Sequence, residues 1–243
     1  MSTSSVHVEG ADPARRWYRV GRFLRHNSLG LFFLFTFLLA LAGQAVAGHA
    51  DFNNQLVSDG MAPISFGAYL TTSDFAADVT ENWQSEYLQF FLYIFGTVWL
   101  LQRGSPESKE LGKAGTESDE DQMVGEHATD ASPRWAAARD WRAVVYSRSL
   151  GLVMGVIFLL SWLTQSITGV AAYNEQQLRG LQAPLSWAGY LSSADFWSRT
   201  LQNWQSELLA VASMAILAIY LRQRGSPESK PVGASHSATG AEG

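Results

Sequence analysis

Two long stretches of this 243-residue chain contain no Asp, Glu, Lys or Arg. They lie between Arg25 and Asp51 and between Arg148 and Glu175. Each stretch is long enough for an apolar helix of about 20 residues that crosses a bilayer. Charged residues make up only 16% of the chain, whereas soluble domains average about 25%. The sequence therefore predicts an integral membrane protein.

The two stretches belong to a tandem repeat with an offset of 121 residues. Residues 28–109 align with residues 149–230 without a gap, and 34 of the 82 aligned pairs are identical. Each copy also holds a second, shorter apolar stretch. We therefore expect an all-α protein with four transmembrane helices, at residues 29–47, 82–101, 150–169 and 203–221. Residues 29–103 form the first repeat and residues 134–224 the second.

The basic residues predict the orientation of these helices. Fifteen of the 17 Lys and Arg residues fall before the first helix, between the second and third, or after the fourth. The predicted outer loops, residues 48–81 and 170–202, contain only Arg179 and Arg199. The positive-inside rule then places both termini in the cytoplasm. Two repeats of two helices each have the same orientation, so a pseudo-two-fold axis would run along the membrane normal.

The segments outside the helices are polar. Residues 1–28 form a basic cytoplasmic arm, and Ala45-Val46-Ala47 resembles a signal-peptidase site, although we expect no cleavage because the apolar run is long. The acidic linker at residues 104–133 and the tail at residues 225–243 have few apolar residues, which predicts disorder. Residues 14–25 and 134–148 fit interfacial helices or plain topology signals.

The outer loops carry repeated residues of their own. Pro63 and Pro184 suit the first turn of a short helix. Its aromatic side chains, Phe66 and Tyr69 in the first copy and Trp187 and Tyr190 in the second, would share one face and lie at the membrane interface. Ser73 in the first copy and Ser193 in the second are the expected N-caps of the next helix. On the membrane helices, Gly151 with Gly155, and Gly43 with Ala47, permit close helix contact.

A set of polar residues is predicted to lie at membrane depth. The block Asn-Trp-Gln-Ser-Glu occurs at residues 82–86 and again at residues 203–207. The uncharged parts of the second and fourth helices are too short to span a bilayer unless this block lies within it. We expect a ring around the pseudo-two-fold axis, formed by Glu86, Glu207, Gln44, Gln165, Asn82, Asn203, Ser85 and Ser206.

Three interpretations of this ring stay open. Carboxylates at membrane depth often mark function, so Glu86 and Glu207 could form a cation or proton site. They could instead bond to Gln, Asn or the indoles of Trp83 and Trp204, which would fix helix register. They could also lie at the interface and reach water.

The cytoplasmic ends carry a second repeated block, Gln-Arg-Gly-Ser-Pro-Glu-Ser-Lys, at residues 102–109 and 223–230. Gly104 and Gly225 suit the position after a helix C-terminus. Ser105 and Pro106 then look like the N-cap and first residue of a short helix. Retention of the whole block also fits a cytoplasmic docking element.

No motif in the sequence predicts catalysis or a cofactor. The chain has no cysteine, and its five histidines are not duplicated. We find no phosphate-binding glycine loop and no metal-ligand spacing, so we expect no metal and no cofactor. A nucleic-acid partner is not expected, because topology accounts for the arginines.

The Asn-Trp-Gln-Ser-Glu and Arg-Gly-Ser-Pro-Glu-Ser-Lys blocks, with Pro-Ile-Ser-Phe-Gly-x-Tyr-Leu in the outer loop, resemble an uncharacterised bacterial integral-membrane family, a domain-of-unknown-function family. The resemblance implies a bacterial inner-membrane location and no particular activity. We expect a non-enzymatic structural or accessory membrane protein that associates with itself or with another membrane complex. The alternative is a small cation or proton channel or transporter that uses Glu86 and Glu207.

Overall fold

The computed structural model describes residues 13–241, and in this part of the chain all regular structure is helical. The chain divides into two compact units, residues 1–70 and residues 71–243. The first unit contains α1 (Pro13–His26), α2 (Ser28–Ser58) and α3 (Phe66–Tyr69). The second contains α4 (Ser73–Trp99), the 3-10 helix η1 (Gly125–His127), α5 (Trp141–Tyr146), α6 (Ser149–Arg179), α7 (Trp187–Leu191) and α8 (Ala194–Tyr220).

The helix bounds follow the 121-residue offset of the sequence. Helices α2 and α6 both have 31 residues and begin and end at aligned positions, as do the 27-residue helices α4 and α8. All four extend beyond the predicted spans on the side of the outer loops. A 27-residue helix is about 40 Å long, so α4 and α8 are not too short for a bilayer.

Two of the helices, α2 and α6, are long and apolar enough to cross a membrane. Their length follows from the absence of internal proline and the continuous run of apolar side chains. Many of these side chains stay exposed, among them Leu159, Leu160 and Leu163 on α6. An exposed apolar surface of this kind is suited to contact with lipid.

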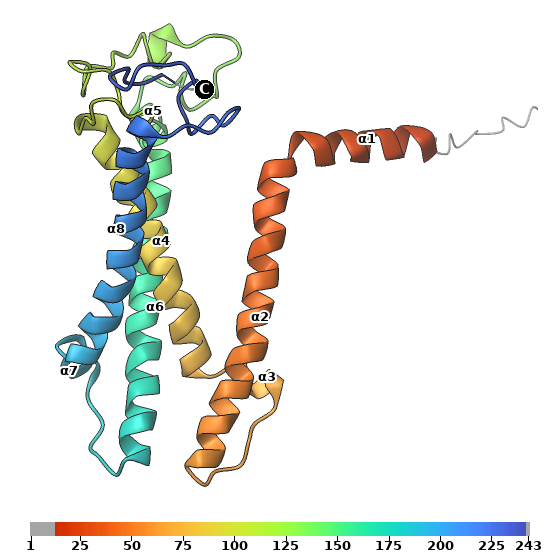
Figure 1. Ribbon diagram of the computed structural model, residues 1–243, viewed down its shortest axis with the longest axis vertical. Coiled ribbons are helices and arrows are strands. Elements are labelled where there is room, and N and C mark those ends of the chain that lie inside the picture. Colours follow the sequence, from red (N-terminus) through yellow and green to blue (C-terminus); the bar gives the residue numbers. More distant parts are fainter. Residues whose placement is uncertain (1–12, 242–243) are drawn as a thin grey trace, which may run out of the picture. The chain divides into compact units, whose positions relative to one another are not determined.

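In the second unit, α4 packs along α6 and also contacts α8 (Figure 1). The glycines of α6 lie against aromatic rings of α4: a Cβ placed on Gly151 would be 2.9 Å from Phe95, and one on Gly155 would be 3.0 Å from Phe91. The prediction of close helix contact is therefore confirmed for α6. Gly43 lies on α2 in the first unit, and its contact with another long helix stays a prediction.

The same asparagine clamp holds the outer loop in each copy. In the first unit, Asn53 donates to Ile64 O at 3.0 Å and accepts from Ile64 N–H at 2.8 Å. In the second unit, Asn174 bonds both backbone groups of Leu185 at 2.8 and 2.7 Å. These bonds explain why both copies keep the asparagine: they satisfy loop backbone groups that have no helical partner.

The short helices differ in detail from the prediction. Ser65 and Ser186 are the N-caps of α3 and α7, so Pro63 and Pro184 precede these helices instead of lying in their first turns. The tyrosines at the end of the aromatic faces are buried: Tyr69 is 3% exposed and Tyr190 is 1% exposed. The tyrosines therefore pack inside the protein, and only the other members of the predicted aromatic faces, Phe66 and Trp187, are exposed.

The long helices that follow begin with side-chain caps. Ser193 accepts from Phe196 N–H and is the N-cap of α8, as predicted. In α4 the cap is Thr72, which accepts from Phe75 N–H. The prediction of Ser73 was wrong by one residue, because threonine offers the same hydroxyl acceptor one position earlier.

At the opposite ends of α4 and α8 the two Gln-Arg-Gly-Ser-Pro-Glu-Ser-Lys blocks form turns. Gly104 and Gly225 have the expected positive φ, +85° and +79°. Residues 105–109 and 226–230 form turns and bends with no helix, so the predicted short helix at Ser105 and Pro106 is wrong. The serine side chains close a tight turn instead. The linker and tail form further turns beside them, with many backbone hydrogen bonds.

Candidate functional site

A cluster of paired charges lies at the α7 end of the second unit, where α4, α6 and α8 meet. Arg199 on α8 is at its centre. Its guanidinium lies 3.1 Å from Glu81 and 3.8 Å from Asp78, both on α4, and 3.6 Å from Asp195 on its own helix. Asn203 adds a hydrogen bond of 2.7 Å to the other oxygen of Glu81. Together these contacts tie α4 to α8.

The Glu81 side chain is mostly buried, at 13% exposed, while that of Arg199 is 41% exposed. Burial lowers the pKa of Arg199, but the charges of Glu81 and Asp195 and the hydrogen bond to Glu81 together raise it by more. The net direction of the pKa is therefore upward. Arg199 therefore stays positively charged, and Glu81 has two charge-assisted or amide donors. This ion pair joins two helices. Removal of Arg199 would leave the mostly buried charge of Glu81 without its ionic partner.

Tyr190 connects this cluster to α7. Its hydroxyl donates to Asp195 at 3.1 Å, and its ring contacts Tyr173 and Phe196. Burial raises the pKa of Tyr190, and the negative charge of Asp195 raises it further. The phenol is thus a permanent donor. Gly169 makes room for it, because a Cβ at that position would lie 2.7 Å from the hydroxyl oxygen.

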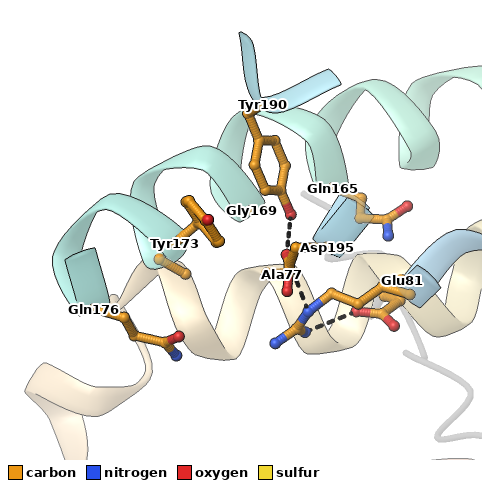
Figure 2. A pocket seen from close by; sticks show the side chains of 10 residues that line it. Ala77, Glu81, Gln165, Gly169, Tyr173, Gln176, Tyr190 and Asp195 are labelled. Atoms are coloured by element: carbon orange, nitrogen blue, oxygen red, sulfur yellow. Dashed lines mark hydrogen bonds and ion pairs between the residues drawn. The ribbon is translucent and has the colours of Figure 1, made fainter. Parts of the chain in front are cut away.

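A small polar cavity lies beside Tyr190 and Asp195 (Figure 2). Its volume is about 10 Å³, which is about the space of one water molecule. Gln165 lines it and is only 2% exposed, yet neither its amide oxygen nor its nitrogen has a partner among the described residues. An unpaired buried amide is costly, so the cavity is suited to a bound water. The remaining lining residues are Ala77, Glu81, Gly169, Ala172, Tyr173, Gln176 and Arg199.

The two glutamates of the predicted ring lie elsewhere. Glu86 is exposed and Glu207 is partly exposed. Neither carboxylate has a hydrogen bond in the described part of the chain. The indole of Trp204 donates instead to Gln84 at 2.7 Å, so the predicted bond from an indole to a glutamate is replaced by one to a glutamine.

The remaining members of the predicted ring are divided between several surroundings. Ser85 is buried and Ser206 is exposed, and each donates to the backbone oxygen three residues earlier, at 2.9 Å. Asn82 is exposed and bonds its own helix backbone at Asp78 O, whereas Asn203 reaches Glu81. Gln44 lies in the first unit and is described only with that unit. Of the eight predicted residues, only Gln165 lines the cavity and only Asn203 joins the charge cluster.

The sequence reasoning missed Glu81, Arg199, Asp195 and Tyr190 as a cluster. The predicted ring consisted of polar residues that both copies keep on the membrane helices. The charges at the centre of the observed cluster differ between the copies: Asp78 aligns with Arg199, and Glu81 aligns with Gln202. A useful signal was present in that change. When the helices of two copies pack against each other, equal charges at aligned positions would repel. An acid in one copy and a base in the other can form a salt bridge between them.

Within residues 13–241 no group of three or more His, Asp or Glu side chains is arranged to hold a metal ion. The acids of the cluster point to Arg199 instead of converging on an empty position. The site as described can therefore bind water and fix helices through ion pairs.

The comparisons with known proteins give one family. A domain of unknown function (DUF6766) matches residues 20–241 of the chain. The chain belongs to this family. No curated protein and no solved structure matches it. The DUF6766 match covers both repeats and the linker between them, and it agrees with the resemblance to an uncharacterised family.

Proposed function

We propose that this DUF6766 protein is a non-enzymatic structural or accessory protein of the bacterial inner membrane, with four spans and both termini in the cytoplasm. The observation that carries the proposal is the Glu81–Arg199–Asn203 cluster. Its polar side chains bond to one another and so join α4 to α8, as expected for a cluster that fixes the positions of helices.

Membrane insertion is supported by the apolar surfaces of α2 and α6. For α4 and α8, the support comes from their length and from their alignment with the repeat. Their charged residues gather at the α7 end, and only one acid on each, Glu86 and Glu207, lies within the predicted span. The strong bias of basic residues toward one side supports the orientation.

Association with a second copy or with another membrane protein is the other part of the proposal. Glu86 is exposed on α4 at a depth where a carboxylate usually faces protein or water. A partner that covers this surface would remove the carboxylate from lipid. We expect the purified protein in nanodiscs to show a mass above that of one chain, by light scattering, or to carry a stoichiometric partner. A strictly monomeric protein without a partner would contradict this part.

A second candidate function is cation or proton passage through the glutamates. It is favoured by one observation, that both copies keep a glutamate at the aligned positions Glu86 and Glu207 within the predicted spans. In proteoliposomes, passage would appear as a proton or cation flux that is lost when Glu86→Gln and Glu207→Gln are combined. The control is Glu126→Gln on the linker. Flux that is absent, or unchanged in the double variant, would exclude this function and leave the structural one.

A further inference from the structure

The two Gln-Arg-Gly-Ser-Pro-Glu-Ser-Lys blocks fold into the same turn. In the first turn, residues 102–109, Gln102 N–H donates to Ser108 Oγ at 2.9 Å; in the second turn, residues 223–230, Gln223 N–H donates to Ser229 Oγ at 2.9 Å. Both serine hydroxyls donate to the next lysine carbonyl at 3.1 Å. The repeated sequence thus specifies one local structure twice, and the two turns can be compared atom by atom.

The first turn is covered by the C-terminal tail. Gly104 N–H donates to Thr239 Oγ1 at 2.9 Å, and Gly240 N–H donates to Ser105 O at 3.1 Å. His236 O lies 2.4 Å from the position of a Cβ on Gly104, so only glycine leaves room for the tail. Gly104, Ser105 and Pro106 are buried as a result.

Lys230 holds the tail in this position. Its ammonium donates to Gly104 O at 2.6 Å and to three carbonyls of the tail at 3.1 Å, those of Ser235, His236 and Ala238. The residue is 1% exposed. Burial lowers the pKa of Lys230, and the four carbonyls compensate the charged form. The lysine therefore forms a charge-assisted link between the first turn and the tail.

The second turn has the same shape but no such cover. A Cβ built on Gly225 has no described atom within 4 Å, and Gly225 and Pro227 are exposed. Gly225 N–H has no acceptor within the described residues. In the described part of the chain, Ser226 O accepts only from Ser229 N–H, at 3.2 Å, inside the turn, which leaves one of its lone pairs available.

The linker, which follows the first turn as the tail follows the second, is held elsewhere. Lys109 pairs with Glu117 on the linker, and Gly115 N–H donates to Val98 O at 3.0 Å, near the end of α4. These contacts keep the segment after the first turn beside α4. The face of the second turn is thereby left without an occupant from this part of the chain.

We propose that the second turn is a docking site for an extended peptide segment with the chemistry of residues 235–240. Such a segment offers a side-chain hydroxyl to Gly225 N–H and a backbone N–H to Ser226 O. Apart from one histidine, it consists of small residues, which fit against a glycine at positive φ. The tail on the first turn shows how the backbone groups of this turn bind a peptide, and the open second turn presents the same two groups, although the counterpart of Lys230, Lys109, is paired with Glu117. The partner is a protein that presents this segment in the cytoplasm.

The probe for this site is a labelled peptide of residues 231–241, added to the full chain in nanodiscs. The protein's own tail stays on the first turn, because its tether gives it a high effective concentration. We expect one peptide to bind each chain. In Gly225→Asn, which tolerates positive φ but fills the face, we expect binding to weaken at least about tenfold.

The matched control is Gly112→Asn, another glycine at positive φ (+91°) with open space, which should bind as the natural protein does. A peptide with Thr239→Val should bind more weakly, because it lacks the hydroxyl acceptor. Two results would overturn the proposal: no binding to the natural chain, or equal binding to the natural chain and Gly225→Asn. The second would mean that the peptide displaces the tail from the first turn.

Discussion

At the scale of single residues, the pairing of Glu81 with Arg199 decides how α4 and α8 are joined. Changing Glu81 to Gln keeps the shape but leaves Arg199 with weaker acceptors in a half-buried position. We expect a loss of roughly 1–3 kcal/mol in the free energy of unfolding, the range for a hydrogen-bonded charge that loses its partner. Unfolding of the detergent-solubilised protein by SDS measures it.

The aligned residue of the other copy provides the control for this change. Gln202 is exposed, so Gln202→Ala should stay within about 0.5 kcal/mol of the natural protein. Equal losses in Glu81→Gln and Gln202→Ala would show that the cluster does not stabilise the fold.

Asp74, at the start of α4, predicts a pH dependence. Burial raises its pKa above 3.8, and Glu175 raises it further, against the opposing charges of Arg179 and Arg199. The folded state therefore holds the proton more tightly than the unfolded state. The stabilising contribution is complete below pH 3.8 and is lost as the pH rises through the raised pKa. As the pH rises from 3.8 through the raised pKa, the free energy of unfolding of Asp74→Asn should fall less than that of the natural protein.

The exposed linker residue Asp121 has the opposite sign, because Ser118 lowers its pKa. Its contribution is present above pH 3.8 and is lost as the pH falls through the lowered value. In thermal unfolding scanned from about pH 2 to pH 7, Asp74→Asn should remove part of the stability loss seen as the pH rises above 3.8, and Asp121→Asn should remove part of the loss seen as the pH falls below 3.8, so the two variants change the pH dependence in opposite directions. Shifts of the same sign in the two variants would contradict the assignment.

At the scale of helices, the seam between α4 and α6 depends on glycine. A methyl group on Gly151 would meet the Phe95 ring at 2.9 Å, and overpacking of this kind costs about 1–3 kcal/mol. Gly151→Ala should therefore destabilise the protein in the same unfolding assay. The control is Gly96 on α4, where a Cβ would lie at an ordinary 3.6 Å from Leu100, so Gly96→Ala should be neutral or slightly stabilising, since alanine favours helix. Equal effects at the two positions would exclude a specific seam.

The sequence predicted the existence and order of the long helices because apolar length and the repeat are both local patterns. It predicted Ser193 as a cap and the contact of the α6 glycines for the same reason. It could not predict the Arg199 cluster, because Asp78, Glu81 and Arg199 come together only when α4 packs beside α8. The tail contact at Gly104 was also missed, since it joins residues more than a hundred positions apart through backbone atoms that have no sequence signature.

At the scale of the whole molecule, the proposed topology depends on how many helices cross the membrane. Composition and length make α2 and α6 candidate spans, whereas the spans at α4 and α8 are proposed from the repeat, the helix lengths and the distribution of arginines. The position of the linker distinguishes the two cases. With four spans it lies in the cytoplasm, and with only α2 and α6 as spans it lies on the opposite side from the N-terminus.

The absence of cysteine from the chain makes this test direct. Single variants Ser118→Cys on the linker, Ser237→Cys on the tail and Leu181→Cys in the loop after α6 are treated with a membrane-impermeant maleimide in intact bacterial spheroplasts. Leu181 is 96% exposed and should react at once. Four spans predict that Ser118→Cys and Ser237→Cys react only after the membrane is opened. Labelling of Ser118→Cys in intact spheroplasts, with Ser237→Cys protected, would contradict the four-span topology.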